Sequence, residues 1–481
     1  MDSINDTPRG DRLHISIFGR RNAGKSSLIN AITHQKVAVV SEIPGTTTDP
    51  VYKSMEVLPL GPVVFIDTPG IDDVGMLGEL RVEKTKEVLR KTDIGILVTT
   101  ADCPWGEPEG ELLLQLKNRN IPVIIALNKC EQINSIDDNY FDEMNSNEMD
   151  KHRINNKETG INGASTGGAD NCTMNMIDRL AEYLDMDDDN DDEAKRRLYD
   201  EDPCVFYRQF INSKIRIDVP VVKTSALTGE GIEDLISKLA EIKKADDQKM
   251  HLVDGLIEPG DLALLVVPVD KAAPKGRLIL PQQQVLRDIL DNSAMALVVK
   301  DTELEQALKK LKCKPDIVIT DSQVFDKADA IVPKDIPLTS FSIIYARSKG
   351  DLNRFLEAVN FIKELRDGDN ILIAEGCTHH RKDDDIGTVK IPNLLKKKTG
   401  KFLNFHYVSG GFFEKDLSQY KMVIHCGACM LNKKEMEYRQ EFSQNNGVPM
   451  INYGIILAYL HGILDRAIKP FKKELNGGYQ K

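Results

Sequence analysis

The chain has 481 residues, including eight cysteines, and a formal net charge of −12. This length allows about three domains, each able to bury its own core. Residues 131–205 hold 21 acidic and 7 basic residues, so the remainder is nearly neutral. A neutral body argues against nucleic acid or an anionic membrane as the main partner. The start is polar and no apolar stretch is long enough to span a bilayer, so we expect a cytoplasmic protein.

A phosphate-binding loop, G-R-R-N-A-G-K-S-S, lies between a predicted strand over 13–18 and a helix that begins near Lys25. Backbone N–H groups of such a loop bind a polyphosphate, and its glycines keep side chains out of the way. We expect Lys25 to contact the β- and γ-phosphates and the Ser26 hydroxyl to bind Mg²⁺. A simple glycine-containing turn is the alternative. The nucleotide-binding residues expected here are Gly19, Asn22, Ala23, Gly24, Lys25, Ser26 and Ser27.

The other parts of a guanine-nucleotide switch follow in the required order. Thr47 lies in a polar segment about twenty residues past the loop, where its hydroxyl would contact Mg²⁺ and the γ-phosphate. An apolar strand over 63–66 leads into D-T-P-G. We expect Asp67 to hold Mg²⁺ through water and the Gly70 N–H to lie beside the γ-phosphate. A simple strand-ending turn accounts for the Pro-Gly pair but not for the residues before it.

The base-binding motif follows strands predicted over 94–99 and 123–127. It reads Asn128-Lys129-Cys130-Glu131, with Glu where Asp is usual in the guanine-recognition sequence. The longer side chain makes guanine selectivity less secure than nucleotide binding. After a strand over 219–223, Ser225 and Ala226 would place a backbone N–H near the guanine O6. A helix over 231–242 would close the domain.

Two positions bear on hydrolysis. Ile71 follows the D-T-P-G motif, so the water-orienting Gln of Ras-like switches is missing. Asn22 lies where the potassium-activated branch of translation-factor-like GTPases carries an Asn, and this resemblance implies K⁺ in place of an arginine finger. Asp73 lies where relatives in that branch have an acidic water-orienting residue. A solvated loop carboxylate is the alternative for Asp73; Lys25 and Asp73 are the catalytic residues expected.

The next segments differ in character. Residues 131–205 are acidic and poor in periodic apolar residues, so we expect a largely disordered insertion at about 132–204. Beyond it, a small βαβ domain that mediates association is expected. Its predicted strands cover 261–267, 295–299, 316–319 and 341–345, and its predicted helices cover 284–291 and 303–312.

The last part contains two cysteine groups. A helix over 351–366 and a strand over 370–374 precede Cys377-Thr378-His379, and a strand over 421–424 precedes His425-Cys426-Gly427-Ala428-Cys429. Both groups follow the carboxyl ends of apolar strands, where α/β sheets bind ligands, so three thiolates can converge. Such a set suits a structural Cys3His zinc site or an iron–sulfur cluster, and the residue types do not separate the two. Small buried cysteines without a ligand are the third alternative.

The combination of a GTPase domain with Asn22, the sequence A-P-K-G-R-L-I-L-P at 273–281 and the two cysteine groups resembles the iron-only hydrogenase maturation GTPases. This resemblance covers the chain except the insertion. It implies a homodimeric scaffold with a [4Fe–4S] cluster on Cys377, Cys426 and Cys429, and His379 and His425 are the candidates for the fourth ligand. Family members carry the two-iron subcluster precursor, built with two radical-SAM maturases, to the apo-hydrogenase.

The expected fold is therefore α/β throughout. It consists of a P-loop GTPase domain at 1–245, a dimerisation domain at 252–346 and an iron–sulfur domain at 348–481. The cofactors are GTP or GDP, Mg²⁺, K⁺ and the cluster. An RNA-modification or ribosome-associated GTPase with a zinc site is the main alternative, disfavoured by the lack of a basic, aromatic-rich region. A non-catalytic metal carrier with a degenerate GTPase domain is disfavoured because Lys25, Ser26 and Asp67 are intact.

Overall fold

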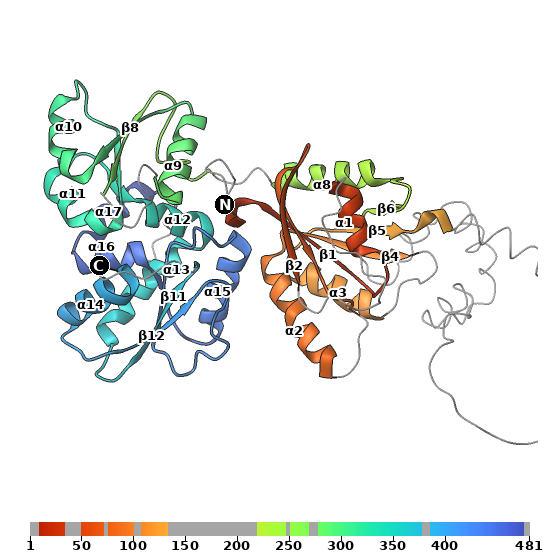
Figure 1. Ribbon diagram of the computed structural model, residues 1–481. Coiled ribbons are helices and arrows are strands. Elements are labelled where there is room, and N and C mark those ends of the chain that lie inside the picture. Colours follow the sequence, from red (N-terminus) through yellow and green to blue (C-terminus); the bar gives the residue numbers. More distant parts are fainter. Residues whose placement is uncertain are drawn as a thin grey trace, which may run out of the picture. The chain divides into compact units, whose positions relative to one another are not determined.

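The computed structural model describes residues 9–33, 50–71, 76–100, 107–132, 219–246, 251–268, 278–377 and 385–475 (Figure 1). Thr47, Asp73, His379 and the acidic insertion lie outside these ranges. No helix in the described ranges is long and apolar enough to cross a membrane. The chain forms two compact units, Leu13–Gln248 and Lys249–Lys481, and the second also includes the N-terminal residues through Arg12.

The first unit is built on a six-stranded sheet with the order β2-β3-β1-β4-β5-β6. All neighbouring strands are parallel except β2 and β3. Its strands are β1 (Leu13–Gly19), β2 (Val51–Val57), β3 (Gly61–Asp67), β4 (Ile94–Thr100), β5 (Val123–Asn128) and β6 (Val221–Lys223). Its helices are α1 (Lys25–Thr33), α2 (Met76–Lys91), α3 (Glu107–Asn118) and α8 (Ile232–Asp246).

Both faces of this sheet are covered (Figure 1). Apolar residues of α2 and α3 pack with Phe18 and Leu97 on one face. Those of α1 and α8 pack with Ile17 and Val98 on the other. Central strands buried on both faces read as continuous apolar runs, which is why they were predicted from the sequence. The parallel strands bring their carboxyl ends, and the loops that follow, to one edge of the sheet.

The second unit contains two four-stranded parallel sheets, with the orders β10-β9-β7-β8 and β12-β11-β13-β14. The first comprises β7 (Leu262–Val267), β8 (Met295–Lys300), β9 (Ile317–Thr320) and β10 (Leu338–Ser340), and the second β11 (Asn370–Glu375), β12 (Asn404–Ser409), β13 (Met422–His425) and β14 (Met450–Asn452). The helices are α9 (Leu280–Asp291), α10 (Leu304–Lys310), α11 (Phe325–Ile331), α12 (Phe341–Lys349), α13 (Leu352–Glu357), α14 (Ile391–Thr399), α15 (Lys433–Asn445), α16 (Tyr453–Leu460) and α17 (Leu464–Ala467).

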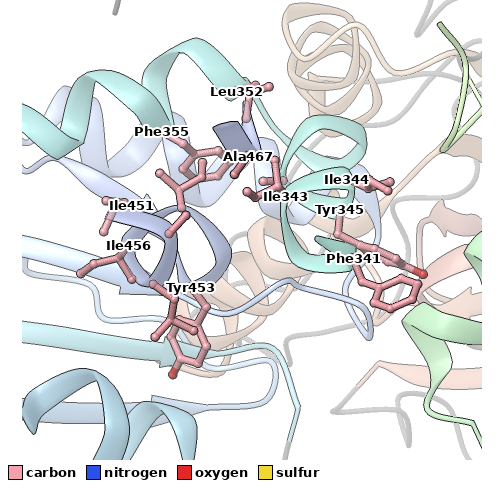
Figure 2. Packing of buried hydrophobic residues seen from close by; sticks show 14 of the residues in the cluster. Phe341, Ile343, Ile344, Tyr345, Leu352, Phe355, Ile451, Tyr453, Ile456 and Ala467 are labelled. Atoms are coloured by element: carbon pink, nitrogen blue, oxygen red, sulfur yellow. The ribbon is translucent and has the colours of Figure 1, made fainter. Parts of the chain in front are cut away.

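One continuous hydrophobic core joins the two sheets of this unit. Figure 2 shows a part of it, where side chains of α12 lie among residues of α13, β14, α16 and α17. The helix α12 directly follows the last strand of one sheet, and the chain then passes through α13 to the other sheet. This helix therefore links the two sheets both along the chain and through the core.

The strand predicted over 341–345 is wrong, because these residues begin the helix α12. The strand of this region is β10, which ends at Ser340. The Ser340 hydroxyl accepts a hydrogen bond from the Ile343 N–H and caps the helix. The helix predicted over 351–366 is also shorter than expected: α13 ends at Glu357 and a 3₁₀ segment continues through Glu364.

Candidate nucleotide and cysteine sites

The phosphate loop connects β1 to α1. The Lys25 ammonium is buried and donates hydrogen bonds to the carbonyls of Gly19 (2.8 Å) and Arg20 (2.7 Å). The exposed Asn22 has a left-handed backbone, with φ of 62°. A Cβ on Gly24 would lie 2.3 Å from the Asn128 amide nitrogen, so a side chain does not fit there. The loop is thus shaped by backbone groups, as phosphate binding requires.

Two of the three residues predicted to hold Mg²⁺, Ser26 and Asp67, lie in direct contact. The Ser26 hydroxyl donates to Asp67 Oδ2 at 2.5 Å. Burial raises the pKa of Asp67 above its ordinary value, while the Ser26 hydrogen bond and the Lys25 charge oppose this effect. Hydroxyl and carboxylate oxygens are the ligand types that Mg²⁺ prefers. This pair therefore fits a magnesium site of the P-loop kind.

The base-binding residues meet where β5 and β6 end. The Asn128 amide donates to the Ala23 carbonyl (2.9 Å) and accepts from the Ala226 N–H (3.1 Å), so it joins the phosphate loop to the loop after β6. Within that loop the Ser225 hydroxyl accepts from the Thr228 N–H (3.0 Å).

Glu131 shows a feature that the sequence does not reveal. In the described part of the chain, its Oε2 atom is buried and has no hydrogen-bond partner. A buried acceptor without a partner is costly, and it is satisfied when a ligand brings donors. The guanine N1–H and 2-amino groups are such donors. The longer carboxylate at this position thus has an acceptor atom available for a ligand.

An ion pair that was not predicted flanks the phosphate loop. The Arg20 guanidinium donates to both carboxylate oxygens of Glu109 on α3, at 2.6 and 2.9 Å. Glu109 is almost fully buried. The paired geometry fixes the arginine beside the loop. The sequence carries no signal for this pair, because the partners lie 89 residues apart.

The cysteine groups lie at the carboxyl edge of the sheet β12-β11-β13-β14 in the second unit. Strands β11 and β13 are parallel neighbours, so Cys377 and Cys426 leave the sheet at the same edge. The Gly376 and Ala428 N–H groups donate to Cys426 Sγ at 3.0 and 3.4 Å. Such donors stabilise a thiolate and tune metal sites. Ala428 adopts a left-handed backbone, with φ of 56°, and this turns the loop back toward Cys426.

The three cysteines influence one another electrostatically. Burial, followed by the neighbouring cysteines, raises the pKa of Cys377 to about 12. Burial and Cys426 raise the pKa of Cys429 to about 12, and burial raises that of Cys426. Metal binding must therefore displace thiol protons. Across the described ranges, no three Cys, His, Asp or Glu residues are grouped closely enough to hold a metal ion. The donor set fits a soft metal or cluster, although the thiols are not closed around it.

His425, one of the two candidates for the fourth ligand, has both ring nitrogens in contact with other groups. One ring nitrogen, Nδ1, lies 2.9 Å from the Cys426 carbonyl, and the other, Nε2, lies 3.1 Å from Arg439 Nη1. Because arginine only donates, Nε2 must accept and the proton must be on Nδ1. Burial and the Arg439 charge lower the pKa of His425 to about 3. Both nitrogens are engaged, so His425 has no lone pair for a metal.

The buried ion pair behind His425 was also missed from the sequence. Arg439 and Glu435, both on α15 and both buried, form a hydrogen-bonded pair at 2.9 Å. Arg439 also donates to the Gly410 carbonyl at 3.1 Å. An (i, i+4) Glu–Arg pair on a helix is normally a surface feature. Most buried residues of α15 are polar, so the sequence of this helix gives little signal that the pair is buried.

Three family models match the chain. The model described as "50S ribosome-binding GTPase" matches residues 14–129, the "Hydrogen maturase F dimerization domain" matches 252–350, and the "Hydrogen maturase F tetramerization domain" matches 353–470. The first covers the phosphate loop and the first two residues of the base motif, Asn128 and Lys129. The last covers the three cysteines.

Curated relatives match the GTPase domain only in part. GTPase Era of Halothermothrix orenii is 37% identical over 121 residues, which cover 25% of this chain and 41% of that protein. The tRNA modification GTPase MnmE of Prochlorococcus marinus is 32% identical over 166 residues, which cover 34% of each protein. The chain thus spans less than half the length of these curated relatives.

Solved structures give weaker likenesses. Era of Aquifex aeolicus bound to GDP and AlF4⁻ has a TM-score of 0.31 at 18% identity, with 60% of this chain and 92% of that chain covered. The G domain of the FeoB iron transporter of T. maritima has a TM-score of 0.26 at 20% identity, with 48% and 99% covered.

The GTPase, dimerization and tetramerization models occur in this order along one chain, and the last of them contains the paired cysteine groups. The chain belongs to the hydrogen maturase F family of hydrogenase maturation GTPases.

Proposed function

We propose that this protein is a GTP-hydrolysing scaffold that binds a [4Fe–4S] cluster and carries a two-iron subcluster precursor to apo iron-only hydrogenase. The observation that carries the proposal is the arrangement of the cysteines. Cys377 and Cys426 follow the neighbouring parallel strands β11 and β13, and Cys426 Sγ accepts hydrogen bonds from two backbone N–H groups. Cys377, Cys426 and Cys429 would hold the cluster. The bound cluster supplies redox-active iron with one position free for an exchangeable ligand. Two radical-SAM maturases and the apo-hydrogenase are the proposed partners.

The test is anaerobic reconstitution followed by iron, sulfide and zinc analysis and EPR. Replacing Cys377, Cys426 or Cys429 by Ala should each abolish cluster assembly, because each change removes a strong charged ligand. Cys313→Ala is the matched control, since Cys313 is exposed and outside the site. One zinc per chain, no sulfide and no EPR signal after reduction would favour the structural zinc site and end the cluster proposal.

In the GTPase domain, Lys25 would contact the β- and γ-phosphates, and Ser26 and Asp67 would hold Mg²⁺. Their hydrogen bond to each other supports this role, because it keeps two Mg²⁺ ligands together. Gly70 follows β3 and would face the γ-phosphate. Thr47 and Asp73 keep their expected roles as proposals. Lys25→Ala should remove GTP hydrolysis and leave cluster content unchanged; a matching loss of cluster would contradict separate sites.

Potassium activation is proposed from Asn22, whose exposed side chain and left-handed backbone place it at the rim of the phosphate loop. K⁺ bound there would offset charge beside the phosphates, as an arginine finger does. Hydrolysis rates should therefore rise in K⁺ and not in Na⁺ at equal ionic strength, and Asn22→Ala should remove the difference. Equal rates in the two salts would exclude a potassium role.

The homodimer is proposed to form through β8. This strand lies at the edge of its sheet and pairs on one side only, with β7. On this strand Met295 is 54% exposed and Val298 is 37% exposed. An edge strand with apolar residues offers unpaired backbone groups to a second strand. Residues 252–350, which match the dimerization model, contain this strand.

A further inference from the structure

The last residue of α12, Lys349, is buried, with 8% of its surface exposed. Its ammonium donates three hydrogen bonds, to the Gly10 carbonyl (3.1 Å), Asp11 Oδ1 (3.1 Å) and the Leu431 carbonyl (3.0 Å). An ammonium has three protons, so these oxygens satisfy it completely. One side chain thus joins the N-terminal turn Arg9–Asp11 to the loop that carries the second cysteine group.

The contact reaches the cysteines directly. Leu431 lies two residues beyond Cys429, and its N–H donates to the Ala428 carbonyl at 3.0 Å. Its side chain occupies the space beside Gly376, where an added Cβ would lie 2.9 Å from Leu431 Cγ. Gly376 precedes Cys377. Holding Leu431 therefore constrains the chain on both sides of the site.

The N-terminal turn packs tightly on this loop. A Cβ on Gly10 would lie 2.8 Å from the Leu431 carbonyl oxygen and 3.0 Å from that of Cys429. These are backbone atoms, which cannot rotate away as a flexible side chain can. Only glycine allows this approach without moving the loop. The turn itself lies outside the three ranges that match family models.

We propose that Lys349 is a positioning residue of the cysteine site, which holds the Cys429 side of the loop against the Arg9–Asp11 turn. The proposal rests on the proposed cluster function, but the hydrogen bonds that carry it belong to the protein alone. Lys349 acts through the loop and is not a ligand. With this contact removed, the three cysteines remain, but Cys429 is no longer fixed relative to Cys377.

The experiment compares full-length wild-type protein with Lys349→Met and Gly10→Ala, which disturb the same contact in different ways. Lys349→Met removes the three hydrogen bonds, and Gly10→Ala pushes the Arg9–Asp11 turn away from the loop. Lys473→Met, at an exposed lysine of the same unit, is the control. In the metal-free protein, hydrogen exchange over 426–432 should become at least about 10-fold faster in both variants, as expected for losing hydrogen bonds to a charged group. Exchange over β7 should not change.

After anaerobic reconstitution, both variants should still bind iron and sulfide, with altered EPR of the reduced cluster and faster iron loss to a chelator. If exchange over 426–432 and the EPR match wild type, Lys349 does not position the site. If wild-type protein assembles no cluster, the proposed function fails, while the exchange result still decides the role of Lys349. Should Lys349→Met fail to fold, Gly10→Ala provides the same test with the ammonium in place.

Discussion

Two glycines in the loop after β6 provide a matched test of how the base site is built. Gly229 and Gly231 both have a left-handed backbone, with φ of 84° and 69°. A Cβ on Gly231 would lie 1.8 Å from the Lys223 carbonyl oxygen, whereas nothing lies within 4 Å of one on Gly229. Replacement by Ala therefore imposes similar backbone strain at both positions. Only Gly231→Ala adds a collision with the backbone of β6.

The expected magnitudes differ accordingly. Left-handed strain for a non-glycine residue costs about 1–2 kcal/mol, which is the whole expected effect of Gly229→Ala. In Gly231→Ala the backbone must also move by more than 1 Å to reach an ordinary contact of about 3.4 Å. We expect a total loss of roughly 3 kcal/mol or more in folding free energy. The movement would displace Ser225, whose N–H donates to the Glu230 carbonyl at 2.9 Å, and with it Ala226.

The assay measures binding of a fluorescent GDP analogue and thermal unfolding for both variants. GDP affinity should fall at least about 10-fold in Gly231→Ala, because the loop that contacts the base moves, and should stay close to wild type in Gly229→Ala. Adenine nucleotide binding serves as the baseline. Equal effects of the two substitutions on affinity would refute the reasoning, since strain alone would then explain both.

Two further predictions concern selectivity and assembly. Glu131→Gln should weaken GTP binding by about 10- to 100-fold and leave ATP binding unchanged, because a hydrogen bond to a charged acceptor is worth about 1.5–3 kcal/mol. Competition binding measures both affinities. An equal change for the two nucleotides would contradict the role of Glu131. Val298→Lys should shift the homodimer toward monomer by at least about 10-fold in dissociation constant, because a lysine on the strand edge opposes pairing, and analytical ultracentrifugation would detect it. An unchanged dimer would remove β8 from the interface.

The strands β1, β3 and β5 of the GTPase domain could be predicted because each is an apolar run followed by a motif, whereas β2 is partly exposed and was not predicted. Each motif is a local signal in the sequence, and the parallel strands then bring Lys25, Ser26 and Asp67 together at one edge of the sheet. The segment 341–345 is mostly apolar and shows no clear alternation of apolar and polar residues. Without such a periodicity, a buried helix cannot be distinguished from a buried strand. Ser340 before the run was the available indication of a helix start.

The contacts that were missed join residues far apart in the chain. The Arg20–Glu109 pair and the Lys349–Gly10 hydrogen bond span 89 and 339 residues. No pattern within one segment can predict such pairs. His425 as a candidate ligand shows the same limit: its position beside Cys426 is visible in the sequence, but Arg439, which contacts its second nitrogen, comes from another element.

The order of the first sheet has a consequence for folding entropy. Strands β5 and β6 are hydrogen-bonded neighbours, yet roughly 90 residues separate them in the chain. Closing a flexible loop becomes less favourable by only about 0.6 kcal/mol for each doubling of its length. By this rule, a flexible chain of about 90 residues costs only roughly 2 kcal/mol more to close than one of about 12 residues. Separation along the chain is thus a small obstacle to the pairing of β5 with β6 and to the contact between Asn128 and the Ala226 N–H.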